Sequence, residues 1–457
     1  MEMLKPGLKK AMFHKILLAY FYCFGLFWAL GLDQLFFVVF CLVGFLAIIT
    51  SPKNYPSREA FFFGLFVLVS FISILQISSP LRYVTYLRNE GVYIAMLFIF
   101  LSSALISAKN IRLTSKLYSA LLIFSLQCSV IAFLASNGIG ISFKTLTAYI
   151  LPDLGSEYLR AMMNKSTIQA EARWFAQGFY RPRGLMMYPN TMAGILASSL
   201  AIKVYFARRY LLRDRLFLVA IICAAIVMDV FSIYSSLSRS AWIGLSVALL
   251  LFPFVFQTSA MTKISTIGMS FVLLGFVFVS GLSDGIQARL FDKTHSNEGR
   301  GLNYQLIWEE TTSSLDKLLF GHGTQVDHWL LNIPLGSHST YLGIFFKYGV
   351  IGSICFLLFL FFLYRQSRAL TKRVNVMNRA GGQFSRPYFL CFALIVPVVQ
   401  IMFIEVDVDL SYAMYFSVLV FLVSQESHAF SRKKLLQRVR EISAIRLQHK
   451  QAVVANS

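Results

Sequence analysis

The chain has 457 residues, of which 57% are hydrophobic and 14% are charged, and its mean hydropathy is +0.65. These proportions exclude a water-soluble globular protein and indicate a polytopic membrane protein. The formal net charge of +21 would suggest nucleic-acid binding in a soluble protein, but here the Lys and Arg residues lie in short segments between apolar runs, where they set membrane topology. We therefore expect membrane lipids, and no nucleic acid, as partners.

A membrane-spanning helix needs about twenty mostly apolar residues, and this rule predicts about twelve spans. The predicted spans are residues 12–31, 35–50, 59–76, 91–107, 117–135, 184–206, 216–234, 241–256, 264–281, 339–364, 387–404 and 410–425. The first follows a basic start and is longer than the core of a cleaved signal peptide, so we expect it to be retained. The sequence predicts an all-α fold, with one transmembrane domain at 1–425 and a basic cytoplasmic tail at 426–457.

The distribution of positive charge orients these spans. With the N-terminus in the cytoplasm, the cytoplasmic segments hold 26 of the 42 Lys and Arg residues, the outer segments hold 13, and three lie within spans. Because cytoplasmic loops are enriched in Lys and Arg, we expect both termini in the cytoplasm. Two long segments, residues 136–183 and 282–338, then lie on the outer side, and we expect the second to be helical.

The first outer segment mixes aromatic residues with Arg160, Lys165 and Arg173, a pattern typical of a helix in the lipid headgroup layer. Such a helix would be a platform for a lipid acceptor, and a packing lid over the helix bundle is the alternative interpretation. The tail at 430–450 places apolar residues on one helical face among seven positive residues. It is either a helix on the anionic inner surface or a solvated terminus.

Four polar clusters lie at span ends on the predicted outer side, where segments distant in sequence can meet. They contain Arg181, Arg183 and Asn190; Ser236, Ser238 and Arg239; Arg300, Trp308, Gly321 and Gly323; and His338 and Tyr341. Converging arginines suit a diphosphate because each guanidinium donates two hydrogen bonds and keeps its charge. Histidine suits proton transfer to or from a hydroxyl near neutral pH. This combination indicates transfer chemistry on a phosphorylated substrate.

Simpler interpretations compete at several positions. A single interfacial arginine is usually an anchor, and we favour that role for Arg82, Arg88, Arg160 and Arg289. His322 and His328 fit no standard metal-ligand spacing, and all six cysteines lie in apolar runs, so we expect neither a metal site nor disulfides. The acidic residues Glu405, Asp407 and Asp409 could bind a cation, but we expect them to pair with arginines.

The order of these clusters resembles that of the O-antigen ligase and polymerase superfamily of membrane glycosyltransferases. The motifs are R-x-x-G then P-N (Arg181, Gly184, Pro189, Asn190), S-x-S-R (Ser236, Ser238, Arg239), Arg then Trp (Arg300, Trp308), G-x-G (Gly321, Gly323) and H-x-x-Y-L then G-x-x-G (His338, Tyr341, Leu342, Gly349, Gly352). The resemblance covers residues 180–352, and the first five spans agree by hydropathy alone.

The resemblance implies transfer of a glycan from undecaprenyl diphosphate to an acceptor at the periplasmic face of the inner membrane, with neither metal nor cofactor. By position, Arg239 and Arg300 would hold the diphosphate and His338 would orient or deprotonate the attacking hydroxyl. Substrate contacts are expected from Arg181, Arg183, Asn190, Ser238 and Tyr341. The chain departs from the family pattern at Ser339, where relatives often have Asn, and at Lys347, where they often have Glu.

Three functions remain open on the sequence. A ligase would transfer the glycan to lipid A-core oligosaccharide in lipopolysaccharide biosynthesis, and the large second outer loop favours it. A polymerase would use a second lipid-linked glycan as the acceptor, and it is favoured by the extra loop at 136–183 and by the Arg183-x10-Gly194 spacing. A transporter would need ionisable residues near the midplane and usually two related halves, whereas here Lys203 and Lys347 are the main charges within spans and no repeat is visible.

Overall fold

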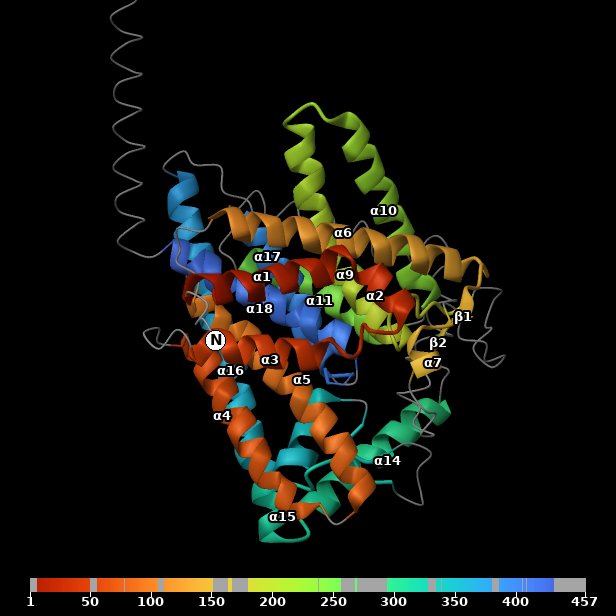
Figure 1. The fold of residues 1–457 in the computed structure, drawn as a ribbon, viewed down its shortest axis with the longest axis vertical. Helices are drawn as coiled ribbons and strands as arrows, with labels where there is room; N and C mark the ends of the chain where they lie inside the picture. Colours follow the sequence, from red (N-terminus) through yellow and green to blue (C-terminus); the bar gives the residue numbers. More distant parts are fainter. Residues whose placement is uncertain are drawn as a thin grey trace, which may run out of the picture.

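The structure is a computed structural model, and it is built almost entirely of helices (Figure 1). It describes residues 6–49, 56–77, 79–105, 111–150, 163–166, 180–236, 238–255, 268, 294–327, 334–337, 339–379, 386–404, 406–407 and 409–430. Within these ranges, the only sheet is one short two-stranded ribbon. The predicted all-α class is therefore confirmed for the described residues.

The helices of the described residues follow one another along the chain. They are α1 (Pro6–Tyr22), α2 (Phe24–Leu30), α3 (Phe36–Ile49), α4 (Arg58–Ile72), the 3-10 helix η1 (Ser73–Gln76), α5 (Pro80–Leu105), α6 (Ile111–Ser136), α7 (Thr147–Ile150), α9 (Pro189–Leu211), α10 (Leu216–Ser235), α11 (Arg239–Val255), α14 (Thr294–Thr311), α15 (Leu315–Phe320), α16 (Thr340–Arg379), α17 (Arg386–Gln400) and α18 (Leu410–Ala429).

Helix α18 forms the centre of the bundle. Every residue from Leu410 to Ser427 is buried, and the helix packs against α5, α16 and α17. A helix with no exposed face is expected only where neighbours surround it on all sides. Of the elements that carry predicted site residues, α9 and α16 therefore lie beside α18.

Fewer helices of the described structure meet the length and hydropathy expected of a membrane span than the sequence predicts. Among the described residues, five helices are long and apolar enough to cross a membrane, or six if α1 and α2, bent by 77°, form one span. Three more apolar helices, α3, α11 and α17, are shorter. The multi-pass character is confirmed, but the count of twelve is not, and the predicted span at 264–281 lies outside the described residues except for Gly268.

The first outer segment differs from the predicted headgroup helix where it is described. Strand β1 (Ser142–Lys144) pairs antiparallel with β2 (Asn164–Ser166), which sets Phe143 opposite Lys165. Phe143 packs edge-on against Trp28 of α2, with ring centroids 5.7 Å apart. Side chains of opposed residues in a ribbon point to the same face, so both residues turn toward the bundle and Lys165 is buried instead of facing lipid headgroups. Arg160 and Arg173 lie outside the described residues.

The described part of the second outer segment contains two helices, α14 and α15, followed by turns, so the prediction of a helical segment is confirmed for residues 294–320 apart from a short turn. Helix α14 packs on the start of α16 through a separate small apolar cluster of Leu306, Ile307, Leu335 and Phe346. Residues 326 and 335 form an isolated antiparallel bridge that closes the segment before α16. This docking places α14, and the arginine at its N-terminal half, beside the rest of the bundle.

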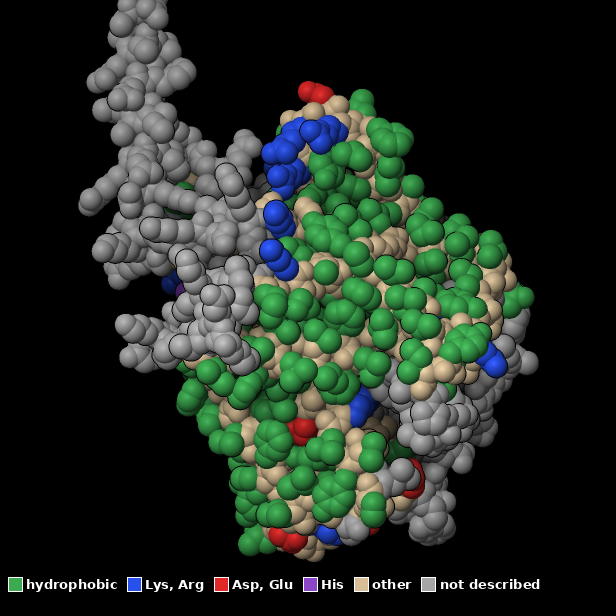
Figure 2. Space-filling view, viewed as in Figure 1, with side chains coloured by type: hydrophobic (Ala, Val, Ile, Leu, Met, Phe, Trp, Pro, Cys, Tyr) green, Lys and Arg blue, Asp and Glu red, His purple; other side chains and the backbone are tan. Residues whose placement is uncertain are grey.

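The predicted outer turns contact one another, and one predicted cytoplasmic turn lies apart from them. The hydroxyl of Ser235, at the end of α10, donates to that of Ser136, at the end of α6, and Ser73 in η1 donates to the Phe320 carbonyl at the end of α15. The turn between α9 and α10 carries four arginines, Arg208, Arg209, Arg213 and Arg215. Figures 1 and 2 show this basic hairpin tip pointing away from α14, α15 and the β ribbon.

Candidate functional site

Arg181 joins two of the four predicted clusters. Its Nε donates to the Ser236 carbonyl (2.7 Å) and its Nη2 donates to Oδ1 of Asn190 (2.9 Å). Asn190 lies in the first turn of α9, which begins with a proline, a residue favoured at a helix start because it has no N–H to satisfy. One guanidinium thus connects the start of α9 to the end of α10.

Gln400 extends this connection to α17. This residue is not among those predicted from the sequence. Its Nε2 donates to the Asn190 carbonyl (2.6 Å), and its Oε1 accepts from the Tyr412 hydroxyl (2.9 Å). A Cβ on Gly194 would overlap the same amide, which gives this glycine a packing role. The available signal was a lone glutamine within an apolar run, because a buried amide needs partners.

The S-x-S-R motif forms the turn that starts α11 with Arg239. Ser238 is buried, its Oγ lies 3.1 Å from that of Ser240, and it accepts a long hydrogen bond from the Ala241 amide (3.4 Å). The Ser238 amide donates to Oγ of Ser236. The serines therefore form hydrogen bonds within the turn. These bonds fix the position at which α11 begins, and Arg239 is the first residue of that helix.

Arg239 and Arg300 approach each other although 61 positions separate them. They lie close enough for their positive charges to repel, and Arg239 is also partly buried. Arg300 is half-buried in α14, whose docking on α16 holds it there. Two guanidinium groups brought together favour an anion between them, because an anion relieves their repulsion and accepts hydrogen bonds from both.

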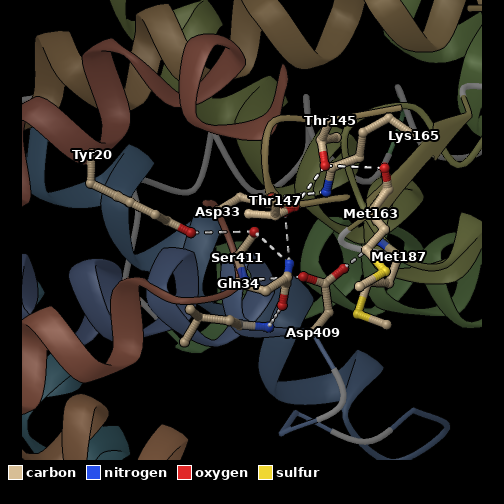
Figure 3. Close-up of polar contacts among 11 residues, drawn as sticks. Tyr20, Asp33, Gln34, Thr145, Thr147, Met163, Lys165, Met187, Asp409 and Ser411 are labelled. Atoms are coloured by element: carbon tan, nitrogen blue, oxygen red, sulfur yellow. Dashed lines mark hydrogen bonds and ion pairs between the residues drawn. The ribbon is translucent and has the colours of Figure 1, made fainter. Parts of the chain in front are cut away.

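Arg183 lies at a different hollow from that arginine pair. This small hollow is lined by Trp28, Asp33, Lys165, Arg183 and the segment 185–187. Lys165 forms a buried ion pair with Asp33 (2.8 Å), and the Met187 amide donates to Asp409 nearby (2.9 Å), as Figure 3 shows.

Tyr341 and the start of α16 are held by the end of α17 and by the segment after it. The Tyr341 hydroxyl donates to the Val398 carbonyl (3.1 Å), and the Thr340 amide donates to the carbonyls of Ile401 and Ile404. Ser339 caps α16, since its Oγ accepts from the Leu342 amide (3.3 Å). His338 lies outside the described residues, so its predicted role is not tested.

The glycine motifs are sites of close backbone packing. Helix α16 breaks at Gly349 (φ 66°, ψ −165°), and the carbonyls of Phe346 and Lys347, just before the break, accept hydrogen bonds from the amides of His322 and Gly323 (2.8 Å each). A Cβ on Gly321 would overlap the backbone of Lys347. The G-x-G turn is therefore docked directly onto the break in α16.

His322 and Arg82 belong to this docking. The His322 ring stacks on Phe346 with centroids 4.3 Å apart, and Arg82 donates to the His322 carbonyl (2.9 Å). Burial, with a further contribution from the charge of Lys317, lowers the pKa of His322. His322 thus helps to dock this loop on α16, whereas His328 lies outside the described residues. Arg82, predicted to be a lipid anchor, holds this loop.

Of the acidic residues after α17, Asp407 forms an ion pair, Asp409 accepts hydrogen bonds, and Glu405 lies outside the described residues. Asp407 forms a buried ion pair with Lys347 (2.7 Å) rather than with an arginine, which identifies the partner of the lysine that departs from the family pattern. Asp409 accepts from the Ser411 amide at the start of α18 and from the Thr191 hydroxyl. Both aspartates thus join α18 and its preceding segment to neighbouring helices.

Part of the chain that contains the arginine pair matches a known protein family. Residues 224–357 match the family model described as O-antigen ligase. The match confirms the resemblance to the O-antigen ligase superfamily. The O-antigen ligase match runs from α10 to the first half of α16 and includes Arg239, Arg300 and both glycine motifs, whereas Arg181 and Asn190 precede it. No curated protein and no solved structure matches the chain.

Proposed function

We propose that the protein is an inner-membrane glycosyltransferase that moves a glycan from undecaprenyl diphosphate to lipid A-core oligosaccharide at the periplasmic face, in lipopolysaccharide biosynthesis. The electrostatic repulsion between Arg239 and Arg300 and the position of both residues within the O-antigen ligase match support this proposal. Both arginines lie within the O-antigen ligase match and come from separate outer segments. A site that brings two positive side chains together is suited to a diphosphate-linked donor.

The proposed chemistry needs only charge stabilisation and one proton transfer. The bond from the sugar to the diphosphate breaks, and the acceptor hydroxyl forms a new bond to the same carbon. Negative charge grows on the leaving diphosphate, and preorganised guanidinium groups of Arg239 and Arg300 stabilise it most in the transition state. His338 takes the hydroxyl proton. Arg181, which is fixed by Asn190, holds the Ser236–Arg239 turn in place.

The arginine roles are tested by substitutions that keep charge and change geometry. Lysine cannot donate the two parallel hydrogen bonds of a guanidinium, so Arg239→Lys and Arg300→Lys should each lower transfer by at least about tenfold at normal membrane abundance. Arg213→Lys, at the tip of the α9–α10 hairpin, is the matched control and should keep full activity. Full activity in either site variant would reduce that arginine to a topological anchor.

The acceptor is tested separately. In vitro, purified protein with lipid-linked donor and rough lipopolysaccharide should yield glycan on lipid A-core. In cells, loss of a ligase leaves polymerised glycan on undecaprenyl diphosphate, whereas loss of a polymerase leaves single repeats on lipid A-core. The second pattern would replace ligase by polymerase. Movement of labelled lipid-linked glycan across vesicles without transfer would place the protein among transporters.

A further inference from the structure

The ion pair between Lys347 and Asp407 occupies an unusual position. Each side chain is only 1% exposed, and Nζ lies 2.7 Å from Oδ2. Lys347 is about two turns into α16, and Asp407 lies in the segment that joins α17 to α18. The pair therefore ties the N-terminal part of α16 to a segment about sixty positions away in the sequence.

The same joining segment also holds the first residue of α16. The Thr340 hydroxyl donates to the Ile404 carbonyl (2.7 Å) and accepts from the Val406 amide (2.9 Å), while the Thr340 amide donates to two carbonyls of the segment. The segment thus attaches to α16 at two levels, at Thr340 and again at Lys347. Two attachments fix a direction, whereas one would leave α16 free to pivot about Thr340.

Lys347 also lies at the contact with the other outer loop. Its carbonyl accepts from the Gly323 amide (2.8 Å), next to the break at Gly349. Its neighbour Tyr348 donates to Glu90 (2.8 Å), which also accepts from Ser70. The side chain and the backbone of one residue therefore connect the two outer segments that flank the start of α16.

Stability alone is a poor reason for this arrangement. Removing two charges from water is costly, and well-packed apolar residues often replace a buried ion pair without loss of stability. Apolar residues would, however, lack the directional contact that sets the position of the 401–407 segment against α16. A fixed geometry is the property that distinguishes the ion pair from an apolar replacement.

We propose that Lys347 and Asp407 are positioning residues for glycosyl transfer. The pair holds the start of α16, where Ser339 and Thr340 lie, in a fixed relation to the segment that joins α17 to α18 and to α14, which carries Arg300. This inference rests on the proposed function. Neither residue contacts substrate, and both act through the backbone at Ser339 and Thr340.

The test compares removal of the pair with its reversal. Single substitutions leave an unpaired buried charge and can prevent folding, so the informative variants are doubles. In Lys347→Met with Asp407→Leu, we expect normal abundance, unchanged KM for the lipid-linked donor and a kcat lowered about ten- to a hundredfold, since small displacements of reacting groups have effects of this size. If the ion pair itself sets the geometry, the reversed pair, Lys347→Asp with Asp407→Lys, should have a kcat at least about tenfold higher than the Met/Leu double variant.

The chain offers a matched control in a second buried ion pair. Lys203 of α9 pairs with Asp229 of α10, both are fully buried, and Lys203 also donates to Ser129 (2.9 Å). Lys203→Met with Asp229→Leu removes the same chemistry from helix contacts that do not touch α16. This variant should keep wild-type kcat wherever it accumulates normally.

A second readout does not depend on activity. Spin labels at Leu315 and Met402, which are exposed on the two outer segments, should show a broader distance distribution in the neutral Lys347/Asp407 double variant than in the wild type. A normally abundant double variant with wild-type kcat, or with an unchanged distribution, would overturn the inference. No transfer by the wild-type protein would instead overturn the proposed function, and with it the assignment of this pair to transfer.

Discussion

Gly349→Ala tests whether the G-x-G turn is docked through backbone contacts. The native φ of 66° and ψ of −165° lie in a region that is essentially restricted to glycine, and placing alanine there costs about 1–3 kcal/mol. The added Cβ would also overlap the carbonyl of Leu319, and relieving such an overlap in a packed interior costs about 1–3 kcal/mol more. Docking of the 319–323 turn on α16 should therefore weaken by about 2–6 kcal/mol.

Amide hydrogen exchange measures this loss locally. The amides of His322 and Gly323 donate across the docked interface, so they exchange when the turn opens. A loss of about 2 kcal/mol corresponds to exchange faster by about thirtyfold. Gly301→Ala is the control, because nothing lies within 4 Å of its Cβ, and alanine favours a helix. Wild-type exchange at both amides in Gly349→Ala would refute the backbone-docking account.

Three further predictions concern topology, pH and catalysis. A reporter fused at residue 310 should be periplasmic and one at residue 375 cytoplasmic, and the reverse would undo the site assignment. Because burial lowers the pKa of His322, its contribution to stability is complete above about pH 6.5 and is lost as the pH falls through the lowered pKa. Melting temperatures between about pH 7 and 5 should thus fall less in His322→Asn than in the wild type. His338→Asn should lower transfer at least about a hundredfold, as measured in the in vitro assay.

The sequence predicts the class of the protein well because composition and loop charge are global properties. A hydropathy of +0.65 leaves few alternatives to a helical membrane protein. The motif clusters also meet in part: Arg181 reaches Asn190 and Ser236, and Arg239 approaches Arg300. Span ends on one side of a bilayer share a limited area, so residues at those ends are brought together whatever their separation in sequence.

Partners of buried charges are not predicted, because they depend on helix packing. Lys347 finds Asp407 and Lys203 finds Asp229 across different helices, and neither spacing has a local pattern. The available rule is that an ionisable residue within a span needs a partner of opposite charge. For Lys347, this rule predicts a carboxylate partner, and the aspartates after α17 are candidates. The sequence prediction instead assigned arginines as the partners of those aspartates.

Local irregularities are also missed by hydropathy. The predicted span at 339–364 is one continuous apolar run, yet α16 breaks inside it at Gly349. The break is stable because amides from a separate loop satisfy the carbonyls that it frees, a tertiary effect that no window of the span contains. The β ribbon at 142–166 likewise depends on the contact of Phe143 with Trp28, more than a hundred positions away.

The start of α16 separates two interpretations of His338. A capping histidine would be worth about 1 kcal/mol of local stability and could be replaced by asparagine. Ser339 already supplies the cap, since its hydroxyl accepts from the Leu342 amide. A proton-transfer role contributes about 10²–10⁴-fold in rate and is lost with asparagine. We therefore expect His338→Asn to accumulate normally and bind donor through the arginines but to transfer poorly, while His322→Asn and His328→Asn stay active. Near wild-type transfer by His338→Asn across the pH range would move activation of the acceptor to Glu309, Glu310 or Asp327.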